Sequence, residues 1–251
     1  MPFLSEPEAS ALRDRFNAVC SRLADAAKAS GRDAADIRLV AISKTHPAPM
    51  LAELFSHWQS GIPAFGENYV QEALQKQTDV TSLLCKTSAG GRLPEWHFTG
   101  HVQTRKAKEV TGRFSLIHTL DSGKLAEQIQ KTVLAQNLPP QAVLVQINIG
   151  GETQKSGIPE SQAEYFINTV RGIPQLRIDG LMCLPPYSDD AEASRPYFVA
   201  MRKLHDTLRD TTGLPLPHLS MGMSHDCEIA VSEGATIVRV GTDIFGAREP
   251  R

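Results

Sequence analysis

The part of the sequence best suited to covalent chemistry is a lysine at the end of an apolar run. Lys44 ends the Val-, Leu- and Ile-rich segment that begins at Arg38. An amine in a partly desolvated site loses some of its positive charge and becomes a better nucleophile toward an aldehyde. Taken by itself, a lysine at a strand end is more often a solvated surface charge. The rest of the chain must therefore decide between these two roles.

Two later segments have the composition of an anion-binding site. Residues 220–224 are Ser-Met-Gly-Met-Ser, and Gly241 and Thr242 follow the last apolar run. Glycine lets the backbone approach a ligand closely, and backbone N–H groups at the start of a short helix can face an anion. Together with Lys44, Ser224, Gly241 and Thr242 predict a small phosphorylated ligand that carries a carbonyl. Pyridoxal 5′-phosphate (PLP) fits this description, and so does a sugar phosphate on which a Schiff-base aldolase would act.

Apolar strands and amphipathic helices alternate along the chain. The predicted strands are residues 38–44, 62–65, 96–100, 116–120, 141–149, 176–184, 216–220 and 235–240. The predicted helices are residues 6–29, 47–60, 70–84, 103–110, 124–136, 159–171, 189–212 and 226–233. Such alternation requires a parallel sheet with right-handed crossovers, and eight units are the number that closes a barrel.

We therefore predict an α/β fold, a single-domain (β/α)8 TIM-type barrel over residues 1–251 with an extra N-terminal helix. A doubly wound open sheet is the alternative. It usually carries a GxGxxG motif after its first strand, and residues 43–47 contain none. In a barrel the loops that follow the strands meet at one mouth. Lys44, Asn68, Ser224, Gly241 and Thr242 are expected to lie there.

Arg239 lies within the eighth predicted strand, where alternation can point its side chain into the barrel. A buried guanidinium needs a partner. An ion pair with a carboxylate is the structural alternative to a role in ligand binding, and the candidate partners are Asp179, Asp243 and Glu228.

Three histidines, His46, His101 and His225, lie on predicted mouth loops. A catalytic histidine needs a second group that orients it, and the sequence identifies none. We therefore expect all three to be hydrogen-bonding loop residues.

Six blocks of the sequence resemble the pyridoxal phosphate homeostasis proteins, in the expected order and nearly from end to end. The blocks are residues 40–45, 65–72, 96–103, 180–182, 219–224 and 238–246. The resemblance implies a barrel similar to the N-terminal domain of alanine racemase, with PLP as an internal aldimine on Lys44. The chain departs from the family pattern at residues 99, 101–102 and 183–184, and residues 85–94 look like a local insertion.

The same resemblance implies a role for each remaining site residue. Ser224, Gly241 and Thr242 would hold the phosphate, Arg239 would face the pyridine nitrogen, and Asn68 would lie beside the ring. An arginine at that nitrogen disfavours its protonation, so the ring would be a poor electron sink.

Two function classes remain, a PLP carrier or buffer and a PLP-dependent enzyme of the racemase kind. Racemisation by two bases needs a second acid/base group, which in alanine racemase comes from an additional β domain. Only eleven residues follow Val240, so we expect no such domain. We predict a non-catalytic protein of vitamin B6 homeostasis whose partners are PLP and, transiently, PLP-dependent apoenzymes.

Bulk properties exclude several other classes. A net charge of −2 offers no basic field for nucleic acid, and no apolar stretch is long enough to span a membrane. The N-terminus carries Glu6 and Glu8 without the apolar core of a signal peptide, so a cytoplasmic location is expected. The four cysteines have no CxxC spacing, which predicts neither a zinc site nor a redox pair.

Overall fold

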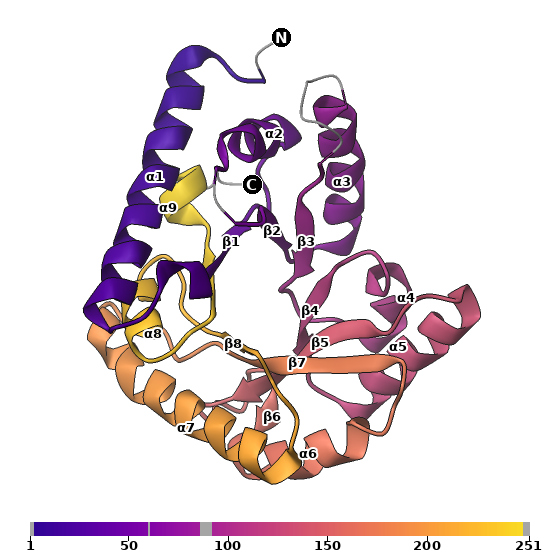
Figure 1. Ribbon diagram of the computed structural model, residues 1–251. Coiled ribbons are helices and arrows are strands. Elements are labelled where there is room, and N and C mark those ends of the chain that lie inside the picture. The colour runs from indigo at the N-terminus through magenta and orange to yellow at the C-terminus, as the bar shows by residue number, and fades with distance from the viewer. Residues whose placement is uncertain (1–2, 60, 86–91, 248–251) are drawn as a thin grey trace.

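A closed barrel of eight parallel strands forms the centre of the computed structural model, which describes residues 3–59, 61–85 and 92–247 (Figure 1). The barrel strands in these ranges are β1 (Arg38–Ile42), β2 (Ala64–Glu67), β3 (Glu95–Phe98), β4 (Leu116–Leu120), β5 (Gln141–Asn148), β7 (Leu176–Cys183), β8 (His218–Ser220) and β9 (Ile237–Val240). β1 pairs with both β2 and β9, and the pairing of β4 with β5 completes the ring. The predicted TIM-type barrel is confirmed.

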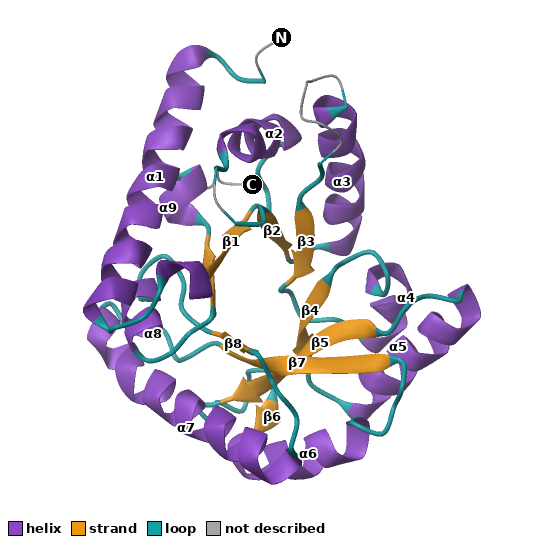
Figure 2. Cartoon of the chain, in the orientation of Figure 1, coloured by secondary structure: helices purple, strands orange, loops and turns teal. Residues whose placement is uncertain are grey.

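Helices surround the ring of strands on the outside (Figure 2). They are α1 (Glu6–Ala29), α2 (Ala48–His57), α3 (Val70–Leu84), α4 (Ala107–Val110), α5 (Gly123–Gln136), α6 (Ala163–Val170), α7 (Arg195–Thr212), α8 (Cys227–Ser232) and α9 (Thr242–Phe245). None of the helices in the described part of the chain is long and apolar enough to cross a lipid bilayer.

The extra N-terminal helix α1 packs against α2, α8 and α9 (Figure 1). Its start is fixed by a capping box, in which Ser5 and Glu8 satisfy backbone N–H groups that have no partner within the helix. Leu12, Phe16 and Val19 recur at three- and four-residue steps and are all buried. One face of α1 therefore joins the core.

The apolar core has two layers, because successive side chains of a strand point to opposite faces. Leu39 and Ala41 of β1 belong to the larger cluster between the barrel and its helices. Val40 belongs to the smaller cluster inside the barrel, which also contains Met182 and Ile237. Since Val40 is the register partner of Arg239 on β9, the side chain of Arg239 also points inward.

Two local predictions were wrong in detail, and a third lies mostly outside the described residues. Residues 103–110 form a 3₁₀ turn (η2, Thr104–Lys106) before α4, because Lys106 N bonds to Gln103 O in an i→i+3 pattern. The helix predicted from residue 159 begins later, at α6, since Ile158–Pro159 pairs with β5 as the two-residue strand β6. Most of the predicted insertion, residues 86–91 within 85–94, lies outside the described residues.

Candidate functional site

Lys44 follows β1 at the end of the barrel where its loops converge. Ser43 N donates to Gly66 O at 3.0 Å, which continues the β1–β2 ladder by one residue. Ser43 is fully buried, whereas Lys44 is half-buried. The lysine therefore lies where the predicted strand end places it, partly desolvated and at the mouth.

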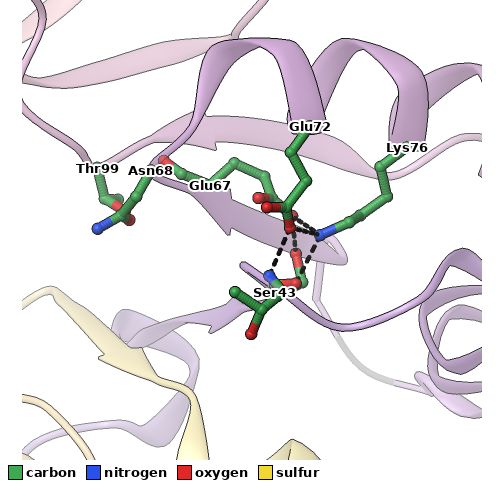
Figure 3. Close-up of polar contacts among 7 residues, drawn as sticks. Ser43, Glu67, Asn68, Glu72, Lys76 and Thr99 are labelled. Atoms are coloured by element: carbon green, nitrogen blue, oxygen red, sulfur yellow. Dashed lines mark hydrogen bonds and ion pairs between the residues drawn. The ribbon is translucent and has the colours of Figure 1, made fainter. Parts of the chain in front are cut away.

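Beside this strand end lies a buried ammonium, that of Lys76 on α3 (Figure 3). Lys76 Nζ donates to Glu67 Oε1 at 2.6 Å and to the backbone oxygen of Ser43 at 2.7 Å. Ser43 Oγ donates to the same Glu67 oxygen at 2.7 Å. Burial raises the pKa of Glu67, and the ammonium of Lys76 opposes that shift. The cluster thus fixes the residue before Lys44 to both β2 and α3.

The residue after Lys44 is held by the same cluster. Glu72, one turn before Lys76 on α3, accepts from Lys76 Nζ at 2.9 Å and from the backbone N–H of Thr45 at 2.5 Å. Thr45 adopts a left-handed backbone conformation with φ of 68°, which costs energy for a β-branched residue. The two backbone neighbours of Lys44 are therefore both fastened, and this restrains the path along which its side chain leaves the strand.

Asn68 comes directly after β2, next to Lys44 in the order of the barrel. Its Oδ1 accepts from Thr99 Oγ1 at 2.8 Å, and the two side chains are drawn at the edge of the group in Figure 3. Because the amide oxygen is bonded to Thr99, the amide NH₂ is the end that can donate to a ligand.

The two predicted anion-binding loops contact each other. Gly241 N donates to Ser224 Oγ at 3.3 Å, which joins the loop after β8 to the loop after β9. As an acceptor in this bond, the Ser224 hydroxyl can still donate its own hydrogen to an anion. Thr242 is exposed and is the first residue of α9. Hydroxyl and backbone donors are therefore gathered where the sequence predicts a phosphate.

Glycine is required in the loop after β8. Gly222 has φ of +88°, and a Cβ built on it would lie 2.5 Å from the Cβ of Ala230. Only glycine adopts that backbone conformation without strain. The carbonyl of Gly222 accepts from Arg239 N at 3.0 Å, so the turn is also bonded to β9, the strand that leads into the second loop.

Gly241 brings the two predicted anion-binding loops next to the lysine. A Cβ at Gly241 would lie 3.2 Å from the backbone oxygen of Ile42, the last residue of β1. This spacing is tighter than ordinary van der Waals contact, and a larger side chain would crowd the end of the strand that carries Lys44. The lysine and the anion loops therefore share one corner of the mouth.

Arg239 is buried inside the barrel without a carboxylate partner at hydrogen-bond distance in the described residues. Its Nη1 donates to Ser220 Oγ at 2.6 Å and its Nη2 to the backbone oxygen of Cys183 at 2.9 Å. Burial lowers the pKa of Arg239, but a guanidinium keeps its proton at any ordinary pH.

The carboxylate partners suggested for Arg239 from the sequence were wrong. Arg177 binds Asp179, and Arg22 binds both Glu228 and Asp243. Other guanidinium groups occupy these carboxylates because they lie outside the barrel, whereas Arg239 points into it.

One mouth histidine does have an orienting group. His101 Nδ1 lies 3.1 Å from Asp121 Oδ2, and Ser156 Oγ lies 3.3 Å from the same nitrogen. Burial raises the pKa of Asp121. The sequence did not identify this group, because Asp121 follows a different strand, β4.

Comparison with known proteins finds relatives over most of the chain. The family model described as "Alanine racemase, N-terminal domain" matches residues 16–249. A pyridoxal phosphate homeostasis protein of Aquifex aeolicus is 41% identical over 94% of this chain and 98% of its own length, and one of Pseudomonas aeruginosa is 38% identical over 96% and 97%. PipY of Synechococcus elongatus PCC7942, solved with PLP bound, is 30% identical with a TM-score of 0.78, covering 94% of this chain and all of that one.

The chain belongs to the pyridoxal phosphate homeostasis protein family. Among the residues predicted to form its site, the structure brings Lys44, Ser224, Gly241 and Thr242 together at one corner of the mouth. Asn68 lies at the end of the adjacent strand, and Arg239 lies inside the barrel.

Several residues that hold the backbone of this site in place were not predicted from the sequence. Glu72 and Lys76 have the i,i+4 spacing of a helical ion pair, which was a usable signal. Glu67 and Arg22 gave no signal of their own, because their partners come from distant parts of the chain.

Proposed function

We propose that this chain binds PLP covalently through Lys44 and acts as a carrier or buffer in vitamin B6 homeostasis. One observation carries the proposal. A half-buried lysine at the end of β1 shares a corner of the barrel mouth with Ser224 and Gly241, in a chain whose relatives are named pyridoxal phosphate homeostasis proteins.

The residues present fit this cofactor. Ser224, Gly241 and Thr242 offer hydroxyl and backbone donors of the kind that bind a phosphate. The absence of a side chain at Gly241 lets its loop lie against the end of β1 at Ile42, the strand that precedes Lys44. PLP supplies an aldehyde that an amine can bind and a ring that withdraws electrons when its nitrogen is protonated.

Each of the chain's own residues would have a distinct part in holding the ligand. Lys44 Nζ would attack the aldehyde carbon and release one water to form the Schiff base. Asn68 would donate its amide NH₂ beside the ring. Arg239 would face the pyridine nitrogen, where a permanent cation disfavours protonation and so disfavours carbanion chemistry.

Borohydride reduction of the PLP-loaded protein, followed by peptide mapping, tests the covalent assignment. The pyridoxyl group is expected on Lys44. Lys155 is the internal competitor, because it also reaches the mouth, where its Nζ donates to Pro185 O at 3.1 Å. A label on Lys155 or Lys106 would contradict the proposal. Lys44→Ala should remove the visible absorption of the bound cofactor while some affinity for PLP is retained.

A carrier should release its cofactor to a protein that needs it. The loaded protein is incubated with an apoenzyme that depends on PLP, and recovery of that enzyme's activity is followed beside an equal concentration of free PLP. Recovery comparable to that with free PLP supports the carrier role. No recovery over hours, with PLP still bound to this chain, would contradict it.

A second candidate, racemase-like catalysis, rests on the match to the alanine racemase domain and on the His101–Asp121 pair at the mouth. Loaded protein is incubated with L-alanine and other amino acids. The carrier proposal expects rates barely above those of free PLP, and unchanged by His101→Ala. Turnover on the order of 1 to 10³ per second that is lost in both Lys44→Ala and His101→Ala would establish the enzyme instead.

A further inference from the structure

Four polar side chains contact one another inside the barrel. His97 of β3, His118 of β4, Ser220 of β8 and Arg239 of β9 are each at most 4% exposed. His97 Nδ1 lies 2.9 Å from His118 Nε2, and His118 Nδ1 lies 3.0 Å from Ser220 Oγ. Arg239 Nη1 reaches the same hydroxyl at 2.6 Å. These contacts cross the barrel from β3 to β9.

The hydrogen positions along this chain of contacts follow from its two ends. A guanidinium can only donate hydrogen bonds, so Ser220 Oγ accepts from Arg239. The Ser220 hydroxyl can then donate its own hydrogen bond to His118 Nδ1. His118 must then carry its proton on Nε2 and donate it to His97 Nδ1. His97 in turn is protonated on Nε2, which lies 3.6 Å from the carboxylate of Glu95. The donors all point from the cation toward the anion.

The opposite direction is disfavoured at the far end. It would place the proton of His97 on Nδ1 and leave the lone pair of Nε2 facing the Glu95 carboxylate, so that two acceptors would oppose each other. It would also require the Ser220 hydroxyl to find another acceptor, and none is recorded within hydrogen-bond distance in the described residues. Both ends of the chain therefore select the same pair of histidine tautomers.

Both rings are also held neutral. Burial lowers the pKa of His97, and lowers that of His118 well below its usual value. The charged and titratable groups that face the two rings are Arg239 on β9, Arg38 on β1, His218 on β8 and Glu95 on β3. Three of these four add positive charge or can gain it, so a further proton on either ring is disfavoured.

We propose that His97, His118 and Ser220 are positioning residues that hold the Arg239 guanidinium through hydrogen bonds that run in one direction from Arg239 to His97, whose Nε2 faces the Glu95 carboxylate at 3.6 Å. This inference rests on the proposed function, in which Arg239 faces the ligand's ring nitrogen. Two acceptors, Ser220 Oγ and the backbone oxygen of Cys183, fix two of the nitrogens of Arg239 from neighbouring strands.

No carboxylate bonds to Arg239 at its end of this series of hydrogen bonds, and this has a consequence for ligand binding. A carboxylate bonded to Arg239 would neutralise the charge inside the barrel. A hydroxyl and a carbonyl orient the same guanidinium and leave its charge to act on the ligand. The carboxylate is placed at the other end instead, with Glu95 paired to Arg38 at 2.5 Å.

The first test uses the protein without cofactor. ¹⁵N-detected NMR of histidine-labelled protein should show His97 and His118 protonated on Nε2 and unprotonated on Nδ1, with neither ring titrating between pH 6 and 8. His205 is the internal reference, because its Nε2 lies 2.7 Å from the Leu216 carbonyl and must donate. An Nδ1 proton on His97 or His118, or titration of either ring in this range, would contradict the proposed direction of the hydrogen bonds.

The second test removes single hydrogen-bonding side chains and measures the absorption spectrum and the affinity of the bound ligand. Ser220→Ala and His118→Phe each remove one link, and His205→Phe is the matched control, a buried histidine outside the barrel. The first two variants are expected to shift the visible absorption maximum of bound PLP and to weaken PLP and pyridoxal by the same factor, about threefold to tenfold. The equal factor is expected because the two ligands share the pyridine ring. His205→Phe should lower the melting temperature and leave the spectrum unchanged, and Ser220→Thr should restore the native spectrum.

The outcomes separate the two proposals. Failure of the native protein to bind PLP and pyridoxal would refute the proposed function and with it the positioning of Arg239 toward a ligand, whatever the tautomers. Normal binding by the native protein, with an unchanged spectrum in both folded chain-breaking variants, would refute the positioning role alone. Melting temperatures of all variants establish that the compared proteins are folded.

Discussion

Arg22 of α1 donates from Nη2 to the backbone oxygen of Ser224 at 3.0 Å. The same guanidinium binds Glu228 of α8 and, at 2.5 Å, Asp243 of α9. Glu228 raises the pKa of Arg22 by hydrogen bonding. One residue of the extra N-terminal helix therefore fastens both predicted phosphate loops, and this gives α1 a role beyond covering the core.

Arg22→Ala should loosen those loops. We expect PLP to bind on the order of tenfold more weakly, from the loss of about 1–2 kcal/mol of positioning, while pyridoxal, which has no phosphate, loses little. Arg13→Ala is the control on the same helix, since Arg13 pairs with Glu6 and Glu53 away from the loops. The affinities for PLP and pyridoxal are measured by titrating each ligand against the native protein and both variants. Equal weakening of PLP and pyridoxal by Arg22→Ala would mean that the residue acts on stability alone.

Direct changes to the loops should show the same selectivity more strongly. Ser224→Ala removes one charge-assisted hydrogen bond, roughly 1.5–3 kcal/mol, or about one to two decades in affinity for PLP. Gly241→Val should cost more, because a β-branched side chain would block the close approach of the backbone to the phosphate. Gly172→Val is a matched control, since a Cβ there meets nothing within 4 Å. If pyridoxal were weakened as much as PLP, the phosphate would have to lie elsewhere.

Most of the fold could be predicted because its signals are local. Strand β4 and helix α3 match their predicted bounds, since their apolar periodicity ends at turn residues. The two-residue strand β6 could not be predicted, because two residues carry no periodicity. Its existence depends on pairing with β5.

Only part of the candidate site could be predicted, because the sequence carries local signals but does not show which distant residues become neighbours. Lys44 and Gly241 lie at strand ends, and strand ends can be located from the sequence. The partners of Arg239 could not be predicted, because Ser220 and the carbonyl of Cys183 become its neighbours only when the barrel closes. The sequence offered carboxylates as the natural partners of a guanidinium, and the fold gives those carboxylates to Arg22 and Arg177.

The buried ammonium beside Lys44 should be important for stability. Lys76→Met leaves Glu67 buried without its ion-pair partner, and we expect a loss of about 3–5 kcal/mol in the free energy of unfolding. Adding Glu67→Gln should recover part of that loss, because the unpaired charge is removed as well. The exposed pair Arg202–Asp206 on α7 is the control, where Arg202→Met should cost under about 0.5 kcal/mol. Urea unfolding measures each value. A double variant less stable than Lys76→Met would show that the ion pair is not the source of the effect.

Glu95 should give the protein a specific acid sensitivity. Its neighbours His97 and Arg38 lower its pKa from an ordinary 4.5 to about 2. A carboxyl group whose pKa is lowered by folding contributes stability that is present above its unfolded pKa and is lost as the pH falls through its folded pKa. The contribution of Glu95 is therefore complete above about pH 4.5 and declines toward pH 2.

Glu95→Gln tests this dependence by urea unfolding at pH 6, 4.5 and 3. At pH 6 the variant should be less stable than the native protein by about 1 kcal/mol, a modest value because Glu95 is partly exposed and solvent screens its ion pair. The difference should shrink as the pH falls below 4.5, since the native protein then loses what the variant never had. Protonation of other groups affects both proteins and cancels in the comparison. Glu164→Gln, an exposed change on α6, should show no such trend. A stability gap for Glu95→Gln that stays constant from pH 6 to pH 3 would show that Glu95 acts through packing and not through its charge.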